Sequence, residues 1–367
     1  MKKYDSFNPG KVWLDSEGKR IQAHGGSILY VDGVYYWYGE NKEKTLAGSE
    51  VWHWGVKLYS STDLYNWDDR GIICPPVTDD YDNWLHFTQY MDRPHIVYNK
   101  GTKKFVMWLK IMHRGKMEDQ HMVIAVADKI TDTFKVIANR NILNMSSGDF
   151  DIFCDDKTQK AYIYFDKVHD YKDYENQHTS IVCAELTDDY TDVNGTYREI
   201  LARGKTELGF EAPAFMQRNG TDYLFVSRTT GYIPNPTEYA TAKDYFGPWK
   251  LIGTVHENDT EHMSFRSQIC SVFKHPHKKD LYIALADRWL TNLPEKIEGN
   301  YYRECLRDAY GVGEQAMSTE EYQKIRALNT PAVRTMALAD YVWLPIEFNG
   351  GKPTIRWYDS WKTEDFE

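Results

Sequence analysis

Two carboxylates, Asp149 and Glu211, stand beside short apolar runs, in the stretches GlyAspPheAsp and PheGluAlaPro. A pair of carboxylates facing one cavity suits glycoside hydrolysis, in which one group protonates the leaving oxygen and the other activates water or attacks. Glu211 is the better candidate for the acid, because the apolar neighbours Phe210, Ala212 and Pro213 would raise its pKa. Asp149 would tune that pKa or orient the sugar. The alternative for Glu211 is a structural carboxylate at a strand start.

These carboxylates belong to a set of polar residues that recurs along the chain. Arg93, Asp149, Glu211 and Gln268 follow one another at intervals of about 56 to 62 residues, and each precedes an apolar run. Such a period is typical of a β-propeller, whose innermost strands line a central channel. Each residue alone could be a turn or cap residue, but the shared phase favours one site. We expect the following at one mouth: Gln22, His24, Asp92, Arg93, Asp149, Glu211, Arg266 and Gln268.

The elements that must position these residues are short strands, rich in β-branched and aromatic residues and separated by Gly, Asn and Asp turns. Residues 27–31 and 34–39 flank AspGly and predict a two-residue hairpin. The unit returns at 95–111, 151–165, 214–227 and 269–286, and several copies are followed by a second hairpin-like stretch. Residues 341–358 complete the last copy. The sequence predicts an all-β, five-bladed β-propeller, forming a single catalytic domain over residues 1–367.

One segment interrupts the repeat. Residues of about 295–336 carry helix formers, and Ser318 with Glu321 fits a capping box. We expect a helical insertion in the last blade, which would either cover the active-site mouth or form an oligomer contact.

Composition excludes several classes of protein. The net charge is -10, so the chain is not expected to bind a nucleic-acid backbone, which needs clustered Lys and Arg. With 42% hydrophobic and 27% charged residues it is neither disordered nor fibrous. Apolar runs such as 122–127 and 281–286 are too short to span a membrane.

The cysteines and the N-terminus bear on the compartment. Five cysteines without CxxC spacing indicate buried thiols in a reducing compartment rather than disulfides or a zinc site. Lys2 and Lys3 are not followed by an apolar stretch, so no secretory signal is seen and a cytoplasmic protein is expected. A chain trimmed at its N-terminus would be extracellular instead.

Aromatic residues are abundant, with 12 Trp and 27 Tyr. Strand packing accounts for most of them, because aromatics favour β-sheets. A few could form a stacking platform for a pyranose ring. The candidates are Trp37, Trp54, Trp108 and Trp289, with Trp289 preferred because it follows Arg288 at a strand end. Arg288 itself is expected to bind substrate beside Trp289.

Several longer motifs carry a family resemblance that covers most of the chain apart from 295–336. The stretches GlyPheGluAlaProAlaPhe (209–215), SerGlyAspPheAspIlePheCysAspAsp (147–156) and SerSerThrAspLeuTyrAsnTrp (60–67) resemble those of glycoside hydrolase family 43, which are five-bladed propeller enzymes. The exo-β-1,3-galactanase branch is suggested by the motifs at 21–26, 35–40, 92–99, 287–289 and 341–346.

The resemblance implies roles for individual residues. Glu211 would be the general acid, Asp149 the modulator of its pKa, and Glu40 and Asp92 would bind sugar. Most members of the family open the first blade with an aspartate base, whereas this chain has GlnAlaHis at 22–24. The galactanase branch shares that absence, and there a glutamine matching Gln268 takes the place of the base, as an amide or as its imidic acid tautomer.

The remaining assignments keep their alternatives. A neutral amide is a weak base, so Gln268 would position water, or it would only bind a hydroxyl while Asp149 or Asp92 is the base. His24 would contact substrate, a central water or a cation, or simply bond to backbone. Arg93 and Arg266 would neutralise the acids. No cofactor is required; oxygen ligands suit a structural calcium ion, but the chain has no contiguous calcium loop.

The function expected from these observations is an inverting exo-glycoside hydrolase that releases galactose from β-1,3-linked galactan or galacto-oligosaccharides. The alternatives are an α-L-arabinofuranosidase or β-xylosidase of the same family, which the missing blade-one aspartate disfavours, and a non-catalytic carbohydrate-binding propeller, which Glu211 and Asp149 disfavour. The expected partner is an oligosaccharide or polysaccharide substrate, with no nucleic acid and no membrane.

Overall fold

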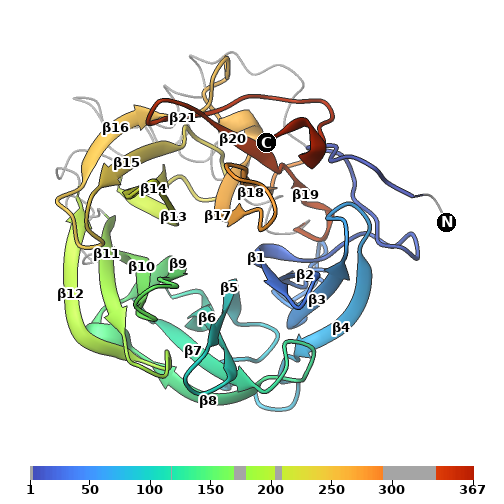
Figure 1. Ribbon diagram of the computed structural model, residues 1–367. Coiled ribbons are helices and arrows are strands. Elements are labelled where there is room, and N and C mark those ends of the chain that lie inside the picture. Colours follow the sequence, from blue (N-terminus) through green and yellow to red (C-terminus); the bar gives the residue numbers. More distant parts are fainter. Residues whose placement is uncertain (1–2, 117, 169–178, 203–208, 292–335) are drawn as a thin grey trace, which may run out of the picture.

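The computed structural model describes residues 3–116, 118–168, 179–202, 209–291 and 336–367. The described strands form five antiparallel sheets that radiate from a central channel, as Figure 1 shows. The first sheet holds β1 (His24–Val31), β2 (Val34–Glu40), β3 (Val56–Ser61) and β4 (Asp68–Cys74), and the second holds β5 (Tyr90–Asn99), β6 (Lys104–Met112), β7 (Gln120–Ala127) and β8 (Lys135–Arg140). The third sheet holds β9 (Ser147–Cys154), β10 (Ala161–Val168), β11 (Thr179–Leu186) and β12 (Val193–Leu201). The fourth holds β13 (Phe210–Arg218), β14 (Thr221–Arg228), β15 (Glu238–Ala242) and β16 (Lys250–Thr254).

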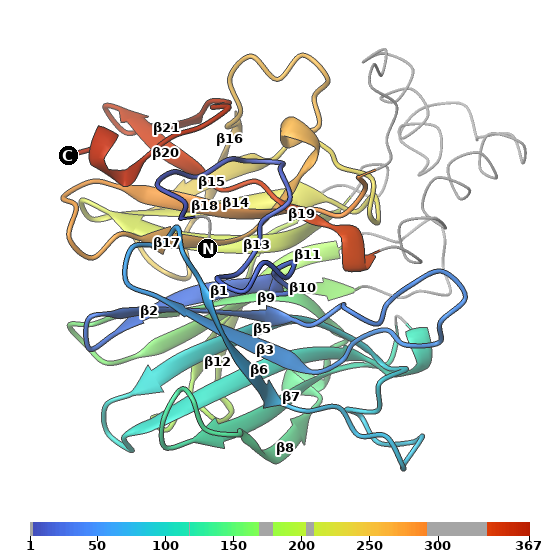
Figure 2. The same cartoon turned by 90° about the vertical axis from the view of Figure 1, so that its right-hand side faces the viewer.

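The fifth sheet is assembled from more distant parts of the chain. It holds β17 (Gln268–Lys274), β18 (Tyr282–Arg288), β20 (Leu344–Asn349) and β21 (Lys352–Ile355), with β19 (Asp340–Tyr341) paired to the end of β18. The predicted five-bladed all-β propeller is therefore confirmed. In the side view of Figure 2 the strands run between the two faces of the disc, so every inner strand reaches both mouths of the channel.

The first hairpin has the predicted two-residue turn. Val31 pairs with Val34 across the turn, and both Asp32 (φ 49°) and Gly33 (φ 86°) lie in the left-handed region. A turn with two positive φ angles matches the twist of antiparallel strands and favours Asp-Gly.

The expected helical insertion finds no support. The helices among the described residues are short 3₁₀ segments, such as His113–Gly115 and Met336–Leu338. Residues 292–335, which carry most of the expected insertion, lie outside the described part of the chain. No helix in the described ranges is long and apolar enough to cross a membrane.

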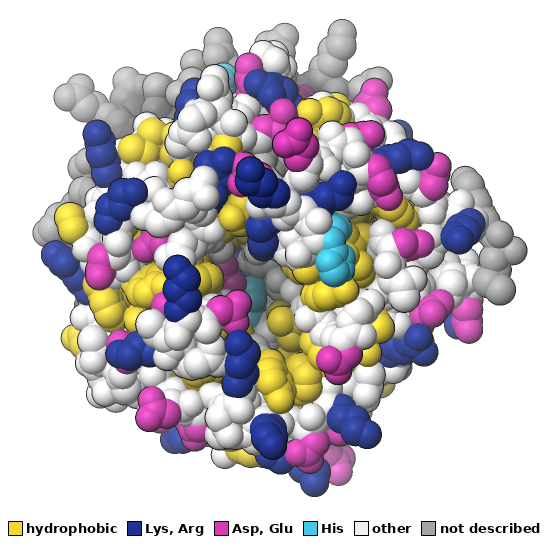
Figure 3. All heavy atoms as spheres, in the orientation of Figure 1, with side chains coloured by type: hydrophobic (Ala, Val, Ile, Leu, Met, Phe, Trp, Pro, Cys, Tyr) yellow, Lys and Arg dark blue, Asp and Glu magenta, His cyan; other side chains and the backbone are white. Residues whose placement is uncertain are grey.

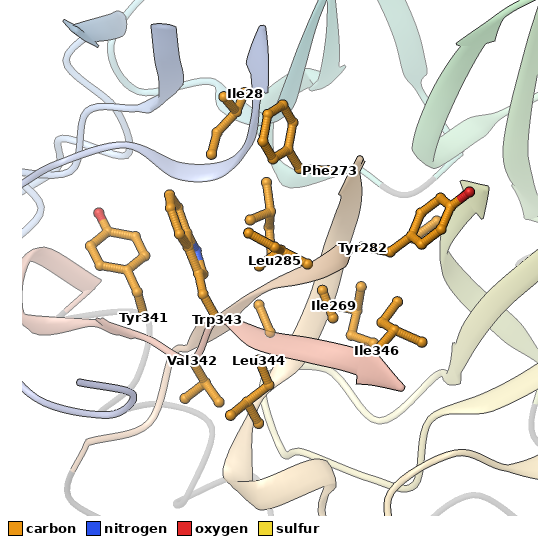
Figure 4. Close-up of a cluster of buried hydrophobic side chains, with 14 of the residues drawn as sticks. Ile28, Ile269, Phe273, Tyr282, Leu285, Tyr341, Val342, Trp343, Leu344 and Ile346 are labelled. Carbon is orange, nitrogen blue, oxygen red and sulfur yellow. The ribbon is translucent and has the colours of Figure 1, made fainter. Parts of the chain in front are cut away.

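Most of the aromatic residues pack between blades. Trp37, Trp67 and Trp343 are almost fully buried, and the Trp37 ring lies 4.5 Å from that of Trp343 in an edge-to-face contact. Figure 4 shows Trp343 beside Tyr341 in this core, with Leu285 and Ile269 of the fifth blade further along it. The prediction that aromatic residues chiefly serve sheet packing is borne out at these positions.

A β-bulge accompanies the polar residue near the start of most inner strands. The pairing register shifts after His24, Asp92, Glu211 and Ile269 in β1, β5, β13 and β17. Arg93 (φ 54°) and Ala212 (φ 51°) take left-handed conformations inside these bulges. A bulge re-aims the neighbouring side chain, and here it lets both Asp92 and Arg93 join the group of charged residues described below.

Four of the cysteines lie in the described residues, and all four are free thiols. Cys74, Cys183 and Cys270 are buried, whereas Cys154 is half-buried. Cys305 lies outside the described ranges.

Candidate active site

Glu211 and Gln268 meet at the start of their inner strands. Gln268 Nε2 donates hydrogen bonds to Glu211 Oε1 at 3.1 Å and to Ser227 Oγ at 2.8 Å. Ser227 lies directly opposite Glu211 in the β13–β14 register. The amide oxygen of Gln268 accepts a short hydrogen bond from Arg93 Nη2. The structure thus brings together the predicted acid and the predicted water-positioning group, although they are 57 residues apart in sequence.

Asp149 lies between two buried cations. Its carboxylate is 3.0 Å from Arg93 Nη2 and 3.2 Å from Lys110 Nζ. Burial would raise the pKa of Asp149, but the charges of Arg93 and Lys110 outweigh it and hold that pKa below its usual value. Asp149 is therefore an anion in the folded protein at neutral pH.

Glu211 has the opposite electrostatic setting. Burial raises the pKa of Glu211 well above its ordinary value, and the negative charges of Asp149 and Asp166 raise it further, against Arg93 and Lys110. The protonated form of one carboxyl group is thus favoured beside another whose ionised form is favoured, which is the arrangement that an acid catalyst needs.

Asp166 of β10 contacts the backbone of Asp149. Its Oδ2 accepts a hydrogen bond from Asp149 N at 2.9 Å. A Cβ on Gly148 would come within 1.8 Å of Asp166 Oδ1, so only glycine allows the carboxylate this close to the strand. Burial, followed by the charge of Asp149, raises the pKa of Asp166 to about 8.

Asp92 and Glu40 extend the acidic group toward the first blade. Lys110 Nζ lies 3.1 Å from Asp92 Oδ2, and Lys42 Nζ lies 2.9 Å from Glu40 Oε2 and 3.8 Å from Asp92 Oδ1. Burial opposes ionisation of Asp92, but Lys110 and Lys42 hold its pKa below the usual value. Burial raises the pKa of Glu40 to about 7 despite Lys42. Lys110 joins Asp92 to Asp149, and Glu40 Oε1 accepts a hydrogen bond from Arg93 N at 2.9 Å, so both acids are linked to the candidate catalytic group.

His24 contacts the site through another residue. Its Nδ1 lies 3.0 Å from Asp287 Oδ1, its Nε2 lies 3.3 Å from Gln22 Oε1, and the side chain is fully buried. Asp287 pairs with Gln268 across β17 and β18 and accepts from Gly25 N at 2.8 Å. His24 is a positioning residue in this geometry, and its partners are side chains rather than backbone.

Trp289 and Tyr232 form an aromatic wall of the site. Both line a pocket together with Gln268, Ser227 and Asp287, and their rings meet edge to face at 5.9 Å. Burial raises the pKa of Tyr232, and the negative charges of Asp92 and Glu40 raise it further. The Tyr232 hydroxyl is thus close enough to these acids to interact with their charges. Of the four candidate platforms, Trp289 is the one that this pocket contains.

The prediction that Trp108 stacks on a sugar is wrong. Its ring is fully buried between the second and third blades, and its Nε1 donates to Tyr190 O at 2.9 Å. Trp37 is likewise core, whereas Trp54 packs under Lys44 Nζ at 3.2 Å from the ring centre. Successive side chains of a strand point to opposite faces of the sheet. An aromatic residue in a strand that reaches the site can therefore still point into the core between two blades.

The two other predicted arginines also lie apart from the catalytic group. Arg288 donates from Nη2 to Phe265 O at 2.9 Å and packs over Trp357, which corrects its expected role in substrate binding. Arg266 pairs with Glu261 at 2.6 Å rather than with the channel acids, although it lines the pocket beside Gln268. Only Arg93 neutralises the ring of acids as predicted.

The residues missed in the sequence follow a simple rule. They lie on the second strand of each blade, opposite or next to the polar residue of the inner strand, and each follows an apolar run. The register pairs Asp92 with Lys110, Glu211 with Ser227 and Gln268 with Asp287. The same rule places Asp166 beside Asp149, and it also places Glu40, which the sequence resemblance had already named, opposite His24.

No group of three or more His, Cys, Asp or Glu side chains in the described ranges is arranged to hold a metal ion. The acids instead have Lys42, Lys110 and Arg93 as counter-charges.

Comparisons with known proteins bear on the family and the fold. The family model for glycosyl hydrolases family 43 matches residues 20–295. The structure of the GH43 β-1,3-galactosidase BT0265 is similar, with 26% identity and a TM-score of 0.76 over 100% of this chain and 65% of that chain. The chain thus spans about two thirds of the length of BT0265. The GH43 β-1,3-galactosidase BT3683, solved with galactodeoxynojirimycin, is 26% identical with a TM-score of 0.74, covering 97% of this chain and 100% of that one.

An exo-β-1,3-galactanase from Phanerochaete chrysosporium, solved with β-1,3-galactotriose, shares the fold at 23% identity, with a TM-score of 0.74 over 98% of this chain and 68% of that chain. No curated protein matches the sequence.

Proposed function

The chain belongs to glycoside hydrolase family 43, and on that premise we propose that it is an inverting, exo-acting hydrolase that releases galactose from β-1,3-linked galactan or galacto-oligosaccharides. The observation that carries the proposal is the electrostatic contrast between Glu211, whose pKa is raised, and Asp149, whose pKa is lowered. Glu211 donates its proton to the glycosidic oxygen as the bond to the anomeric carbon breaks.

The nucleophile is a water molecule on the opposite face of the sugar. Asp149 and Asp92 are poor candidates for its general base, because both are ion-paired and their pKa values are lowered away from neutral pH. Gln268 is the alternative with a hydrogen-bonding oxygen beside Glu211, and a carbonyl oxygen has two lone pairs. One accepts from Arg93, and the other accepts a hydrogen bond from the attacking water. Gln268 thus orients the water, and the oxocarbenium-like transition state needs little activation of it. Once the bond from the water oxygen to the anomeric carbon has formed, the extra proton on that oxygen passes to solvent, which leaves the neutral sugar.

Two observations support galactose as the released sugar. The family members BT0265 and BT3683, each 26% identical, are β-1,3-galactosidases. The first blade presents Gln22 and His24, and His24 contacts both Gln22 and Asp287. The residues that open β1 therefore supply no carboxylate base. The aspartate base expected of arabinofuranosidases and xylosidases is missing there.

One set of assays tests the proposal. The protein is incubated with β-1,3-galactobiose, with an aryl α-L-arabinofuranoside and with an aryl β-D-xyloside, and the released sugar is identified. Galactose release that Glu211→Gln abolishes is the expected result, and proton NMR during turnover should show the α-anomer first, as inversion requires. Release of arabinose or xylose alone would contradict the proposal, and tight binding without turnover would instead indicate a carbohydrate-binding propeller.

The place of action stays a prediction. Oligosaccharides taken up into the cytoplasm would be the substrate, and fractionation that finds the protein outside the cell would contradict this.

A further inference from the structure

The charges inside the channel are arranged differently from those on the surface. Figure 3 shows Lys and Arg side chains interspersed with Asp and Glu over one face of the disc. At the channel mouth, Asp149, Asp92 and Glu40 each lie within 3.2 Å of a buried Lys or Arg. Asp166 is only 4% exposed, yet it forms no ion pair with the cations of the described ranges. A buried carboxyl group without a counter-charge is costly, so its place in the fold needs another cause.

Asp166 lies opposite a β-bulge at the start of β9. The pairing register of β9 with β10 shifts between Phe165 and Lys167. At this shift Asp166 alone faces two residues of the inner strand, Gly148 and Asp149. A bulge disrupts the ladder of backbone hydrogen bonds locally. Here the carboxyl group takes the place of a backbone acceptor, because Asp166 Oδ2 accepts a hydrogen bond from Asp149 N at 2.9 Å.

Gly148 makes this contact possible. A Cβ at this position would lie 1.8 Å from Asp166 Oδ1 and 2.7 Å from its carboxyl carbon, closer than Cβ atoms approach other atoms in proteins. Any other residue at position 148 would therefore displace the carboxyl group. The backbone itself does not need glycine, since Gly148 is not among the residues with a left-handed φ. The carboxyl group of Asp166 is thus the feature that requires glycine here.

Asp149 transmits this constraint to the rest of the site. Its carboxylate is 3.0 Å from Arg93 Nη2 and 3.2 Å from Lys110 Nζ. The same nitrogen of Arg93 donates a hydrogen bond to Gln268 Oε1. A displacement of Asp149 would therefore also release the guanidinium group that orients the amide of Gln268.

Asp166 acts on Glu211 through its charge as well. Burial raises the pKa of Glu211, and the negative charges of Asp149 and Asp166 raise it further, against Arg93 and Lys110. These four residues are also the charged or titratable groups that face Asp166 from the neighbouring strands. An ionised Asp166 therefore favours the proton on Glu211.

We propose that Asp166 is a positioning residue of the hydrolase: it holds the backbone of Asp149 so that the Asp149 carboxylate bridges Arg93 and Lys110, in the space that Gly148 leaves free. Asp166 acts through Asp149 and is not itself a catalytic residue. The inference rests on the proposed function, because the role is defined by the reaction that it supports.

Steady-state kinetics with β-1,3-galactobiose test the proposal. Asp166→Ala removes the acceptor of the Asp149 N–H group. Its kcat should fall by about 10–100-fold, the size of effect that a displacement of about 1 Å in an active site produces, with a smaller change in KM. Asp166→Asn is the conservative variant. Its amide oxygen can still accept the hydrogen bond, so most of kcat should return.

The pH profile separates the charge of Asp166 from its position. Asp166→Asn removes the negative charge, so the pKa of Glu211 should fall. Activity needs the proton on Glu211 and is lost as pH rises through that pKa, so the alkaline limb of kcat/KM should move to lower pH. A residue with a merely structural role would not move this limb.

Gly148→Ala gives a second, independent test. The new methyl group displaces the carboxyl group, so kcat should fall about as far as in Asp166→Ala. In the double variant G148A/D166A the methyl group enters the space that the carboxyl group has left. The two losses should therefore not add, because both variants remove the same contact.

Asp222→Ala is the matched control. Asp222 is likewise a buried aspartate on the second strand of a blade, but it lies at the opposite end of β14 from Ser227, and it accepts from Gln217 Nε2 at 2.8 Å. Its loss should lower the melting temperature and leave kcat of the folded protein unchanged. Additive losses in G148A/D166A would overturn the proposal, as would an unchanged kcat in Asp166→Ala.

A crystal structure of the Asp166→Ala protein keeps the test separate from the proposed function. We expect the Asp149 carboxylate to have moved away from Arg93 or Lys110, and an unmoved carboxylate would overturn the positioning role. A wild-type protein that hydrolyses none of the glycosides would refute the proposed function instead. If Asp166→Ala does not fold, the pH profile of Asp166→Asn decides, and an alkaline limb that stays in place would count against the proposal.

Discussion

Gln268 donates a hydrogen bond directly to Glu211, the proposed acid, with 3.1 Å between Nε2 and Oε1. In an inverting glycosidase the scissile bond and a water molecule must lie between the acid and the group that handles the water, which requires about 6.5–9.5 Å between carboxyl groups in the usual arrangement. Substrate therefore has to break this bond and take its place. A second hydrogen bond fixes the orientation of the amide, because Arg93 donates to Gln268 Oε1. An oxygen that accepts and a nitrogen that donates match the amide of Gln268 rather than its imidic acid tautomer.

Glu211→Gln should lower kcat/KM for β-1,3-galactobiose by about 10²–10⁴-fold, because the glutamine amide cannot donate a proton to the leaving oxygen. An aryl galactoside with an acidic phenol should lose much less, since its leaving group needs no proton. Glu50→Gln, at an exposed position, serves as the control with unchanged rates. Equal losses on both substrates would exclude Glu211 as the acid.

Asp149→Asn should move the alkaline limb of the kcat/KM profile to lower pH. The active form carries a proton on Glu211, so activity is lost as pH rises through the pKa of that group. The negative charge of Asp149 is one of the causes that raise this pKa, so its removal lowers the pKa. Profiles of the wild type and of the exposed control Asp79→Asn should coincide. A limb that stays in place in Asp149→Asn would show that the carboxylate does not tune Glu211.

Gln268→Ala should reduce kcat by about 100-fold, because the attacking water loses its orientation. Gln268→Glu is the matched comparison: it keeps the hydrogen-bonding oxygen and adds a negative charge beside Glu211. That charge should raise the pKa of Glu211 further and shift the alkaline limb to higher pH. If Gln268→Ala retains most of the turnover, the glutamine has no part in the mechanism.

Trp108→Ala should lower the stability of the protein, whereas Trp289→Ala should weaken substrate binding. Trp108 is fully buried between blades, so its loss should reduce the free energy of unfolding by about 3–5 kcal/mol, measured by urea denaturation, with KM unchanged for the folded fraction. Trp289 lines the pocket of Gln268, so its loss should raise KM about tenfold, equivalent to about 1.4 kcal/mol of binding. A raised KM in Trp108→Ala at full folding would contradict its placement in the core.

The repeat could be recognised in the sequence because every blade packs its inner strand in the same way. An inner strand that faces a channel begins with a polar residue and continues as an apolar run, and this phase located Asp92, Arg93, Asp149, Glu211 and Gln268 correctly. The residues that pair with these site residues could not be predicted from the sequence, because their positions depend on which residue of the second strand faces the inner strand across a bulge. Lys110, Asp166 and Asp287 owe their positions to that register.

The sequence alone thus determined the all-β propeller and its five repeats, since strand alternation and turn residues are local properties of the chain. It also singled out Asp149 and Glu211 as the candidate acid pair. Only the tertiary structure decided which aromatics face the site. Trp108 and Trp289 both stand near strand positions of suitable phase, yet one is core and the other lines the pocket. The tertiary structure also set the direction in which the pKa of Asp149 and the pKa of Glu211 shift. Burial and the cations that reach Asp149 from other strands separate its pKa from that of Glu211, and such distances exist only once the blades close around the channel.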